Sequence, residues 1–487
     1  MPHAIRRRQL DAIEHLIATP DRLVPLRDIP LSDLSNDLAS LVDHEVYSPR
    51  PEIVPSRVVK LCRAFGFEWE PLGERGHMRL LPAAAFMFRQ TYHHAGEEAR
   101  QTAESLGAQF FWIDGVNVVD GHSPILARYR SLLANEPGLY GIRPYEISSE
   151  PPAELLLRQT GCVQKFAICR EWSFESTRLP VAVFEISQSF RCEPAETLQL
   201  CARLRRFSLP ESHIHAKSID EALRLTEDLH RTLIRQARGL ADNVQLLVSA
   251  SGELVEHRSK YFMELANSLE RPILVRAYPR HSLCRDGVDL DVEYKIIDSL
   301  GCPREFSTFQ IDRKITRVFG LGGSSSDIKG RLTTIHVVST SSVERNIFFQ
   351  FDRIAASEAR GGAAALPLWL SPVVVRVLAS RAELEAGMII IGQLENGGIR
   401  ADVDDRAISL RRKLEGAKIE AVPYQIVLQK RPHSGRLLVR EHQSGLDQEM
   451  SLGELISRIS SGVRRSAVAP FGRQLSRRPI NTRPEEE

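Results

Sequence analysis

Residues 179–215 read LPVAVFEISQSFRCEPAETLQLCARLRRFSLPESHIH, and this stretch is the best starting point for the fold. An apolar run ends in SQSFR, the turn-forming residues EPAET follow, and a second run leads into two histidines. The pattern predicts two strands joined by a loop. Alternation along the second strand is expected to place Arg203, Arg205 and Phe207 on one face of a sheet.

The chemistry of this predicted face suits a nucleotide. Guanidinium groups match phosphate oxygens in bidentate fashion, and an aromatic ring can stack on a planar base. The alternative interpretation is that arginine and phenylalanine simply alternate across an amphipathic strand. Composition alone does not separate the two interpretations.

His213 and His215 also have two interpretations. A single histidine is more often a structural or surface residue than a ligand. A mixed set of three Cys and His ligands is what an open zinc site uses, and Cys162 and His336 are candidate partners. These residues are too far apart in the chain for a local zinc motif, so spacing alone does not select them.

The whole chain has an ordinary globular composition. Its 487 residues are 43% hydrophobic and 26% charged, which predicts two or three domains. The net charge of +2 gives no argument for a polyanionic partner. No apolar run is long enough to span a bilayer and the start lacks a secretion signal, which predicts a cytoplasmic protein. The seven cysteines form no CxxC pair and indicate reduced thiols.

Four segments are predicted along the chain. Residues 1–55 are interpreted as a small N-terminal appendage of unknown role, with a helix-like pattern that ends at the linker SPRPEIVPS. Residues 56–365 mix helices and strands without regular βαβ alternation, which predicts an α+β domain. Strands and helices alternate in residues 366–463, which predicts an α/β module with a mixed sheet. Residues 464–487 are polar and are predicted to be disordered.

Individual elements follow from periodicity and capping residues. Helices are expected at 85–107 and 218–241, and the second is opened by a capping box of Ser218 and Glu221. A final helix is opened by Ser451 and Glu454. Strands are expected at 110–120, 244–252, 373–378, 399–404, 424–428 and 436–441.

Several separate blocks resemble class II aminoacyl-tRNA synthetases, and among them the archaeal-type threonyl-tRNA synthetases. Residues 179–215 look like motif 2, IHVVSTSSVERNIFFQF (335–351) looks like motif 3, and GHMRLLPAAAFMFRQ looks like the helix that enters motif 1. PLWLSPVVVRV, IRADVDDRAISLRRKL and EMSLGELISRI match the anticodon-binding domain in the same order. The resemblance implies a catalytic domain with an antiparallel sheet, followed by an α/β anticodon-binding domain.

The resemblance implies an ATP site. Arg191 matches the arginine that binds the α-phosphate, Arg203 the loop arginine directed at the outer phosphates, and Arg345 the motif 3 arginine for the γ-phosphate. Arginines and the Mg²⁺ that accompanies ATP stabilise charge that develops on phosphoryl oxygens. Arg191 and Arg345 are therefore the expected catalytic residues.

Four more positions carry roles implied by the resemblance. Glu193 matches the acidic residue that contacts the adenine amino group, and Phe207 matches the ring that stacks on adenine. Thr308 and Gln310 match positions that line the threonine and ATP pocket.

The resemblance also unites three individually weak residues into one zinc site. Cys162, His213 and His336 fall on the family's three zinc ligands, with one Zn²⁺ per subunit. Zinc with three protein ligands has room for the amine and hydroxyl of threonine, and it rejects valine because valine has no hydroxyl. Glu211 replaces the aspartate that is expected to hold the substrate amine, with one more methylene.

The implied reaction has two steps. L-threonine and ATP form an adenylate and pyrophosphate, and the threonyl group then passes to the 3′ end of tRNA(Thr). The first 55 residues are too few for the family's editing domain, so a separate trans-editing protein is expected to remove mischarged serine. The family also implies a homodimer. The alternatives are a paralogue that activates threonine or a related amino acid for a non-tRNA acceptor, and a noncatalytic RNA-binding relative.

Several positions depart from the family pattern. Gly115 stands where motif 1 has a proline, and Ser341 stands where motif 3 has a glycine, so its side chain is expected to crowd the nucleotide. The predicted anticodon contacts are Asp405, in the retained sequence DDR, Arg440, which is also retained, and Arg431. Arg431 replaces a glutamate, and this reversal of charge is expected to relax or redirect tRNA recognition.

Overall fold

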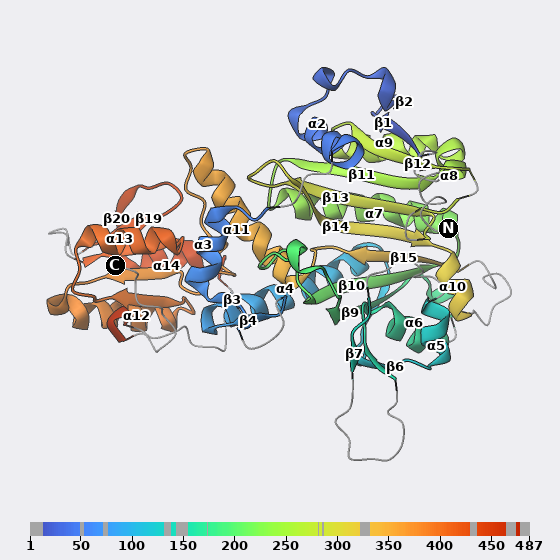
Figure 1. Cartoon of the computed structure of the whole chain (residues 1–487). Coiled ribbons are helices and arrows are strands. Elements are labelled where there is room, and N and C mark those ends of the chain that lie inside the picture. The colour runs from blue at the N-terminus through green and yellow to red at the C-terminus, as the bar shows by residue number, and fades with distance from the viewer. Residues whose placement is uncertain are drawn as a thin grey trace, which may run out of the picture. The chain divides into compact units, whose positions relative to one another are not determined.

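The computed structural model describes most of the chain, and the chain divides into two compact units (Figure 1). The described residues are 13–48, 53–71, 76–130, 138–142, 154–172, 174–280, 282–284, 287–321, 332–428, 436–463 and 474–477. Unit 1 contains Met1–Ile53, His94–Leu198 and Leu204–Asn346, and unit 2 contains Val54–His93, Gln199–Arg203 and Ile347–Glu487. None of the helices in the described ranges combines the length and apolarity needed to cross a membrane.

The centre of unit 1 is a ten-stranded sheet in the order β2-β1-β12-β11-β13-β14-β15-β10-β9-β5. Its strands are β1 (Glu14–Ala18), β2 (Leu23–Pro25), β5 (Gln109–Trp112), β9 (Val181–Phe190), β10 (Arg206–Ala216), β11 (Val244–Ser251), β12 (Ile273–Tyr278), β13 (Leu290–Ile297), β14 (Pro303–Asp312) and β15 (Thr333–Val338). Neighbouring strands are antiparallel except in the pairs β11–β12 and β5–β9. The predicted α+β class with an antiparallel-rich sheet is confirmed.

Helices cover this sheet and join its strands. They are α2 (Asn36–Val42), α5 (Pro124–Arg130), α6 (Cys162–Arg170), α7 (Ile219–Arg238), α8 (Gly252–His257), α9 (Ser259–Leu269) and α10 (Lys314–Phe319). The residues of α4 (Pro82–Ser105) and α11 (Val343–Ala359) are divided between the units. Helix α7 packs across β10, β11, β13, β14 and β15, and Figure 1 shows it lying against the sheet. The buried side of this helix is mostly apolar. Strands β6 (Val118–Asp120), β7 (Gly141–Ile142) and β8 (Leu155–Leu157) form a smaller sheet.

Strands β1 and β2 of unit 1 belong to the large sheet, which differs from the predicted appendage. Strand β1 pairs with β12, from Glu14 opposite Ala277 to Ala18 opposite Ile273. Residues from β1, α2, β11 and β12 share one apolar core, which includes Ile17, Leu26, Leu38, Leu41, Val42, Leu247 and Leu274. A five-residue strand gives too short a pattern to be recognised in the sequence. The predicted boundaries of the four segments stay a prediction.

Unit 2 contains the expected mixed sheet, in the order β17-β16-β18-β19-β20. Strands β16 (Val375–Leu378), β17 (Ala401–Asp404) and β18 (Tyr424–Val427) are parallel, whereas β19 (Leu437–Glu441) and β20 (Asp447–Met450) pair antiparallel. The helices are α3 (Ser56–Phe65), α12 (Leu384–Asn396), α13 (Leu410–Ile419) and α14 (Leu452–Ser460), and β3 (Phe67–Trp69) pairs with β4 (Met78–Leu80). Of the predicted disordered tail, all but Gln474–Arg477 lies outside the described residues.

The predicted helix caps form, with one difference. Ser451 and Glu454 make the full capping box at α14. At α7, the Ser218 hydroxyl accepts a hydrogen bond from the Glu221 N–H, but the Glu221 carboxylate accepts from the N–H of Lys217. The second half of that box is therefore displaced by one residue.

The loop within residues 179–215 corrects the prediction for two arginines. Strand β10 begins at Arg206, so Arg203 and Arg205 precede it and do not share a strand face with Phe207. The loop closes on itself through two backbone hydrogen bonds. The N–H of Arg203 donates to the Gln199 carbonyl at 2.8 Å, and the N–H of Gln199 donates to the Arg203 carbonyl at 2.9 Å. These local bonds take the place of strand pairing in this segment.

Candidate functional site

One face of the large sheet carries most of the predicted site residues of unit 1. Residues that lie directly opposite each other in a sheet point to the same face, and side chains alternate along each strand. His213 of β10 lies opposite His336 of β15, and His336 lies opposite Gln310 of β14. Phe207 and Glu211 share this face with His213 because they are separated from it by even numbers of residues on β10.

A β-bulge extends the same face to a carboxylate that the sequence did not identify. Thr308 lies opposite Glu293 of β13, but the register shifts between Tyr294 and Lys295, so that Glu305 lies opposite Lys295. The extra residue on β14 places Thr308 and Glu305 on the site face although they are three residues apart.

Helix α7 covers the opposite face. Its His230 Nδ1 lies 2.6 Å from the hydroxyl of Tyr294, whose neighbours Glu293 and Lys295 point to the site face. The large sheet therefore separates an apolar core on one side from polar chemistry on the other.

Helix α6 brings Cys162 to the sheet. The residue before it is Gly161, where an added Cβ would lie 2.8 Å from a carboxylate oxygen of Glu185, so glycine allows the start of the helix to approach β9. Cys162, Lys165 and Phe166 lie at i, i+3 and i+4, which places all three on one side of the helix. That side is buried against the site face of the sheet.

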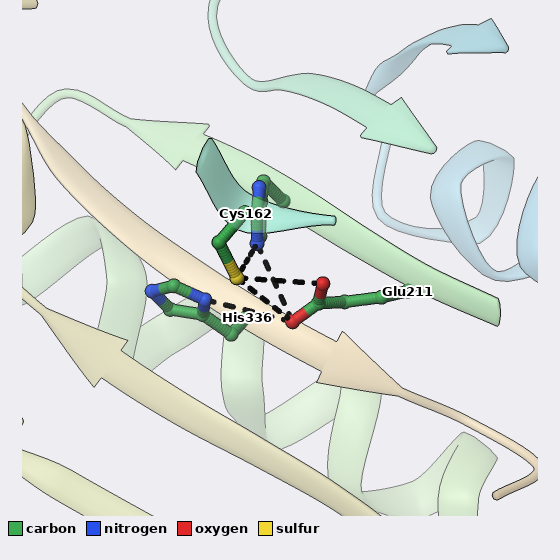
Figure 2. A group of neighbouring side chains, drawn as sticks. Cys162, Glu211 and His336 are labelled. Carbon is green, nitrogen blue, oxygen red and sulfur yellow. Dashed lines mark hydrogen bonds and ion pairs between the residues drawn. The ribbon is translucent and has the colours of Figure 1, made fainter. Parts of the chain in front are cut away.

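Cys162, Glu211, His213 and His336 form a buried cluster (Figure 2). One ligand atom from each residue lies within 4.8 Å of all the others. The Sγ atom of Cys162 lies 3.5 Å from Nε2 of His213 and 3.5 Å from both carboxylate oxygens of Glu211. Oε1 of Glu211 lies 3.5 Å from Nε2 of His213 and 3.8 Å from Nδ1 of His336.

The donor atoms of this cluster fit zinc. Zinc bonds are about 2.3 Å long to thiolate sulfur and about 2.0–2.1 Å long to imidazole nitrogen, and at tetrahedral angles they separate the two ligand atoms by roughly 3.5 Å. The distance between Cys162 Sγ and His213 Nε2 is 3.5 Å. Thiolate and imidazole are also the ligand types that zinc prefers. The residues present are therefore able to hold the metal that the resemblance implies.

A carboxylate lies behind one of these histidines. Oδ2 of Asp312 is 3.7 Å from Nε2 of His336, the ring nitrogen farther from the cluster. Burial opposes a charge on His336, but its contacts with Asp312, Cys162 and Glu211 outweigh burial and raise its pKa well above 6.5. A carboxylate in this position fixes the orientation of a metal-binding histidine.

His215 is a core histidine outside the cluster. Its Nδ1 lies 3.0 Å from the Thr334 hydroxyl, and its ring packs beside Phe166 and Phe174. Burial, with a smaller effect of the charge on His336, lowers the pKa of His215 to about 3. The ring is neutral at physiological pH, which agrees with the structural interpretation of this residue.

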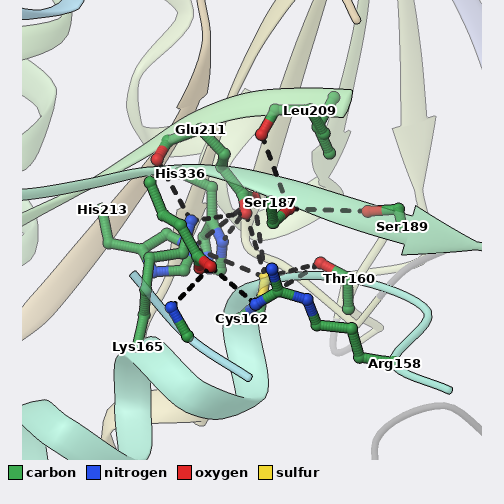
Figure 3. Close-up of polar contacts among 12 residues, drawn as sticks. Arg158, Thr160, Cys162, Lys165, Ser187, Ser189, Leu209, Glu211, His213 and His336 are labelled. Atoms are coloured by element: carbon green, nitrogen blue, oxygen red, sulfur yellow. Dashed lines mark hydrogen bonds and ion pairs between the residues drawn. The ribbon is translucent and has the colours of Figure 1, made fainter. Parts of the chain in front are cut away.

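Lys165 is part of the site, and sequence reasoning missed it (Figure 3). Its side chain is 0% exposed, and its Nζ lies 2.8 Å from Oε2 and 3.1 Å from the backbone carbonyl of Glu211. Burial opposes a charge on Glu211, but Lys165 and His213 outweigh burial and lower the pKa of its carboxyl well below 4.5. The available signal was a lysine within the buried stripe of CVQKFAIC, because a lysine is rarely buried without a partner.

Gly115, which stands where the family pattern has a proline, holds a buried carboxylate through its backbone N–H. Its N–H donates to Oε1 of Glu185 at 2.9 Å, and Nη1 of Arg158 donates to the same oxygen at 2.6 Å. A Cβ at Gly115 would lie 2.8 Å from that guanidinium nitrogen. The proline expected by the resemblance has no N–H, so it could not make this contact.

The predicted ATP residues of unit 1 also approach one another. The guanidinium carbon of Arg191 lies 5.1 Å from the ring centroid of Phe207. Burial and the charge of Glu293 raise the pKa of Glu305, and the positive charges of Arg345 and Arg191 are near enough to oppose that rise. The arginines of the two motifs therefore act on the same carboxylate. Glu193 is buried, and its carbonyl accepts a hydrogen bond from Arg205 at 2.8 Å.

Ser341 adopts a backbone conformation that favours glycine. Its φ is +61°, in the left-handed region, and the residue is buried. A residue with a Cβ is strained in this region. Glycine is therefore favoured at position 341 by the backbone conformation, in addition to the crowding of the nucleotide that a side chain is expected to cause.

The remaining predicted residues belong to unit 2. Arg203 lies in the Gln199–Arg203 turn, which groups with that unit. Arg440 donates two hydrogen bonds to Asp447, at 2.6 and 2.9 Å. Asp405 accepts hydrogen bonds from Ser476, whereas Arg431 lies outside the described residues.

Known proteins resemble this chain over most of its length. Residues 373–461 match the family described as "Anticodon binding domain". The chain is 34% identical over 469 residues to the threonine–tRNA ligase of Thermofilum pendens. The aligned region covers 94% of this chain and 74% of that relative. It is also 35% identical over 449 residues to the threonine–tRNA ligase of Pyrobaculum calidifontis. That aligned region covers 91% of this chain and 71% of the relative.

A solved structure shows the shared fold. The crystal structure of the RNA binding domain of threonyl-tRNA synthetase from Cryptosporidium parvum matches with a TM-score of 0.67 and 17% identity. The match covers 85% of this chain and 100% of that chain.

Proposed function

The chain belongs to the threonine–tRNA ligase family, and we propose that it activates L-threonine with ATP and transfers the threonyl group to tRNA(Thr). One observation carries the proposal: Cys162, His213 and His336 come from three separate elements and converge in a buried cluster whose ligand atoms lie within 4.8 Å of one another. Within it, the 3.5 Å between Cys162 Sγ and His213 Nε2 fits two ligands of one zinc ion. The acceptor is tRNA, because residues 373–461 match an anticodon-binding domain. A non-tRNA acceptor is not favoured.

The site face is proposed to bind ATP through its arginines and aromatic ring. Arg191 binds the α-phosphate and Arg345 the γ-phosphate, and both stabilise the charge that develops on phosphoryl oxygens as the adenylate forms. Phe207 stacks on adenine and Glu193 contacts the adenine amino group. Arg203 keeps its predicted role with the outer phosphates, and Mg²⁺ accompanies ATP.

The threonine side of the proposal rests on the cluster. A zinc ion held by Cys162, His213 and His336 would accept the amine and the hydroxyl of threonine, and valine would be excluded because it lacks the hydroxyl. Thr308 and Gln310 line the same face of the sheet, where the Thr308 hydroxyl donates to Asp291 at 3.1 Å. These side chains orient the amino acid carboxylate towards the ATP α-phosphate.

We also propose that the chain forms a homodimer through the edge of the large sheet. Strand β5 ends this sheet, and its Phe111 and Trp112 are 43% and 44% exposed, with Val116 after them at 63%. An edge strand with exposed apolar side chains favours association. The separate trans-editing partner stays a prediction from the sequence.

The proposed function is tested by threonine-dependent exchange of pyrophosphate into ATP, followed by transfer of labelled threonine to tRNA(Thr). Both reactions are expected. Arg345→Ala is expected to abolish the exchange while the metal content stays that of the wild type. Absence of threonine-dependent exchange in the wild-type protein would overturn the proposal, and exchange without transfer would indicate another acceptor.

A further inference from the structure

We propose that Glu211 is a fourth protein ligand of the metal and that Lys165 holds it in that position, so that the site is closed until threonine enters. This inference rests on the proposed function, because it concerns the metal that the function requires. It goes beyond the three-ligand set, since Glu211 was expected only to hold the substrate amine.

The distances around Oε1 of Glu211 carry the inference. This oxygen lies 3.5 Å from Cys162 Sγ, 3.5 Å from His213 Nε2 and 3.8 Å from His336 Nδ1. Ligand atoms on one tetrahedral zinc ion are separated by roughly 3.3–3.6 Å when the bonds are about 2.0–2.3 Å long. The distances to Cys162 and His213 fall within this range and the distance to His336 is slightly longer, so Oε1 lies close to the position of a fourth ligand atom.

Lys165 explains why the carboxylate stays turned towards the cluster. Its buried ammonium group donates to Oε2 at 2.8 Å and to the Glu211 carbonyl at 3.1 Å, which leaves Oε1 for the cluster (Figure 3). With zinc bound, the negative charges of the Cys162 thiolate, Glu211 and Asp312 equal the positive charges of the ion and Lys165. The charges of these groups then cancel. This favours the arrangement, because an uncompensated buried charge carries a large desolvation cost.

The consequence concerns how threonine enters. A zinc ion with four protein ligands has no open position, so Glu211 must move away when the amine and hydroxyl of the amino acid bind. An aspartate at this position would draw the carboxylate back by about 1.5 Å, the length of one carbon–carbon bond. Glu211→Asp is therefore expected to open the site and to lower the KM for threonine severalfold.

The direct test is the visible spectrum of the full-length protein with Co²⁺ in place of zinc, because this spectrum reports the coordination of the metal. The wild-type protein is expected to give a four-coordinate spectrum that changes when threonine is added. Glu211→Gln is expected to change the spectrum before threonine is added and to weaken zinc binding about 10–100-fold in competition with a chelator. Lys165→Met is expected to resemble Glu211→Gln, and Lys165→Arg to restore the wild-type spectrum in part.

Glu344→Gln, which alters a buried glutamate outside the cluster, is the matched control and is expected to leave the Co²⁺ spectrum unchanged. If Glu211→Gln leaves both the spectrum and the zinc affinity unchanged, Glu211 is not a ligand and the inference is wrong. In that outcome, stoichiometric metal and threonine-dependent exchange in the wild-type protein would leave the proposed function intact. A wild-type protein that binds no metal would overturn both.

A different observation, in unit 2, supports a second proposal. We infer that residues 474–477 occupy the anticodon-reading surface at Asp405 and leave it when tRNA binds. Gln474 forms a parallel bridge with Val403, and Leu475 is buried. The N–H of Ser476 donates to Oδ1 of Asp405 at 3.0 Å, and its hydroxyl donates to Oδ2 at 2.5 Å.

This contact engages both oxygens of a carboxylate that is predicted to read an anticodon base. A base that uses the same oxygens must displace Ser476, because base contacts need their own hydrogen-bond geometry. The segment therefore competes with the anticodon. The inference rests on the predicted role of Asp405 in the proposed function.

Ser476→Ala tests the competition in the full-length protein. The KM for tRNA is expected to fall severalfold, whereas threonine-dependent pyrophosphate exchange stays unchanged, and Leu475→Ser is expected to act in the same direction. Ser460→Ala, which alters a serine whose hydroxyl donates to the Ile456 carbonyl within α14, is the control. A KM that is unchanged or higher in both Ser476→Ala and Leu475→Ser would overturn the inference, while continued charging of tRNA would keep the proposed function.

Discussion

The metal cluster of unit 1 and the anticodon module of unit 2 hold their predicted residues in different environments. Cys162, His213 and His336 are buried on a helix and two strands of one sheet. Asp405 and Arg440 instead pair with groups near the protein surface, Ser476 and Asp447. The difference follows from what each region is proposed to bind. A small amino acid needs a preorganised site, whereas an RNA base can replace the protein group that a base-reading side chain contacts in the free protein.

The largest expected effect tests whether the cluster works as one unit. Cys162→Ser removes the only thiolate ligand of the cluster, so it is expected to weaken zinc binding by more than about a hundredfold. This exceeds the loss of about 10–100-fold that is typical when a residue hydrogen-bonded to a metal ligand is replaced. Threonine-dependent exchange is expected to be lost with the metal. Metal content and pyrophosphate exchange are the measurements.

Cys169→Ala provides the matched control on the same helix. Burial raises the pKa of the Cys169 thiol to about 12, so this residue is a neutral core side chain and not a ligand. Normal zinc content in this variant is expected. Normal zinc content in Cys162→Ser would instead show that the cluster does not bind the metal through this thiol.

The next effect concerns a buried carboxyl beside the ATP residues. Burial raises the pKa of Glu344 to about 7, although the N–H of Ser208 donates to its carboxylate at 3.0 Å. The folded state therefore binds this proton more tightly than the unfolded state. Between about pH 4.5 and pH 7 the free energy of unfolding should fall as pH rises, by up to about 3 kcal/mol from this group, and level off above pH 7.

Glu344→Gln cannot ionise and is expected to remove this contribution. The variant should gain stability relative to the wild-type protein at pH 8 more than at pH 5, and its amide oxygen can still accept from Ser208. Urea denaturation at the two pH values is the measurement. An identical pH dependence in both proteins would contradict the raised pKa of Glu344.

A smaller effect is expected in the anticodon module. Arg440→Ala should lower kcat/KM for tRNA charging about tenfold, in the lower part of the 1–3 kcal/mol expected for a base-reading arginine, and leave pyrophosphate exchange unchanged. Arg436→Ala is the control, because Arg436 lies just before the same strand and pairs with Glu454. If Arg440→Ala also lowered the exchange, the contrast between the two regions would not hold.

The smallest effect concerns the backbone of Ser341. A residue with a Cβ is strained at φ +61°, so Ser341→Gly is expected to raise the free energy of unfolding by up to about 1 kcal/mol and to preserve ATP exchange. Ser342→Gly should instead destabilise the protein, because the Ser342 hydroxyl accepts from the N–H of Arg345 at 3.1 Å. Thermal denaturation distinguishes the neighbours, and equal shifts in both variants would contradict this account.

Local patterns predicted the fold well where they were long. The helix expected at 85–107 is α4 (Pro82–Ser105), and the alternation in residues 366–463 predicted the mixed sheet of unit 2. The patterns failed where elements were short or where a loop satisfied its own backbone. Strand β1 has five residues, and the hydrogen bonds between Gln199 and Arg203 end the strand that alternation had extended.

The candidate site was predicted unevenly for a related reason. The resemblance supplied Cys162, His213 and His336, but Lys165 and Glu305 do not stand out in any motif. Lys165 lies within the buried stripe of α6, and Glu305 reaches the site face only through the β-bulge in β14. Neither a burial partner nor a bulge can be derived from the periodicity of one segment.

The amino-acid sequence alone determined which chemical groups are available and some of the local elements that carry them: histidines two apart on a strand, and helices opened by capping residues. Only the tertiary structure decided which of these groups meet. The pairing of β10 with β15 places His213 opposite His336, and a shift of one residue would turn one of the two rings to the other face. Strand register depends on contacts between distant segments, and local periodicity carries no information about those contacts.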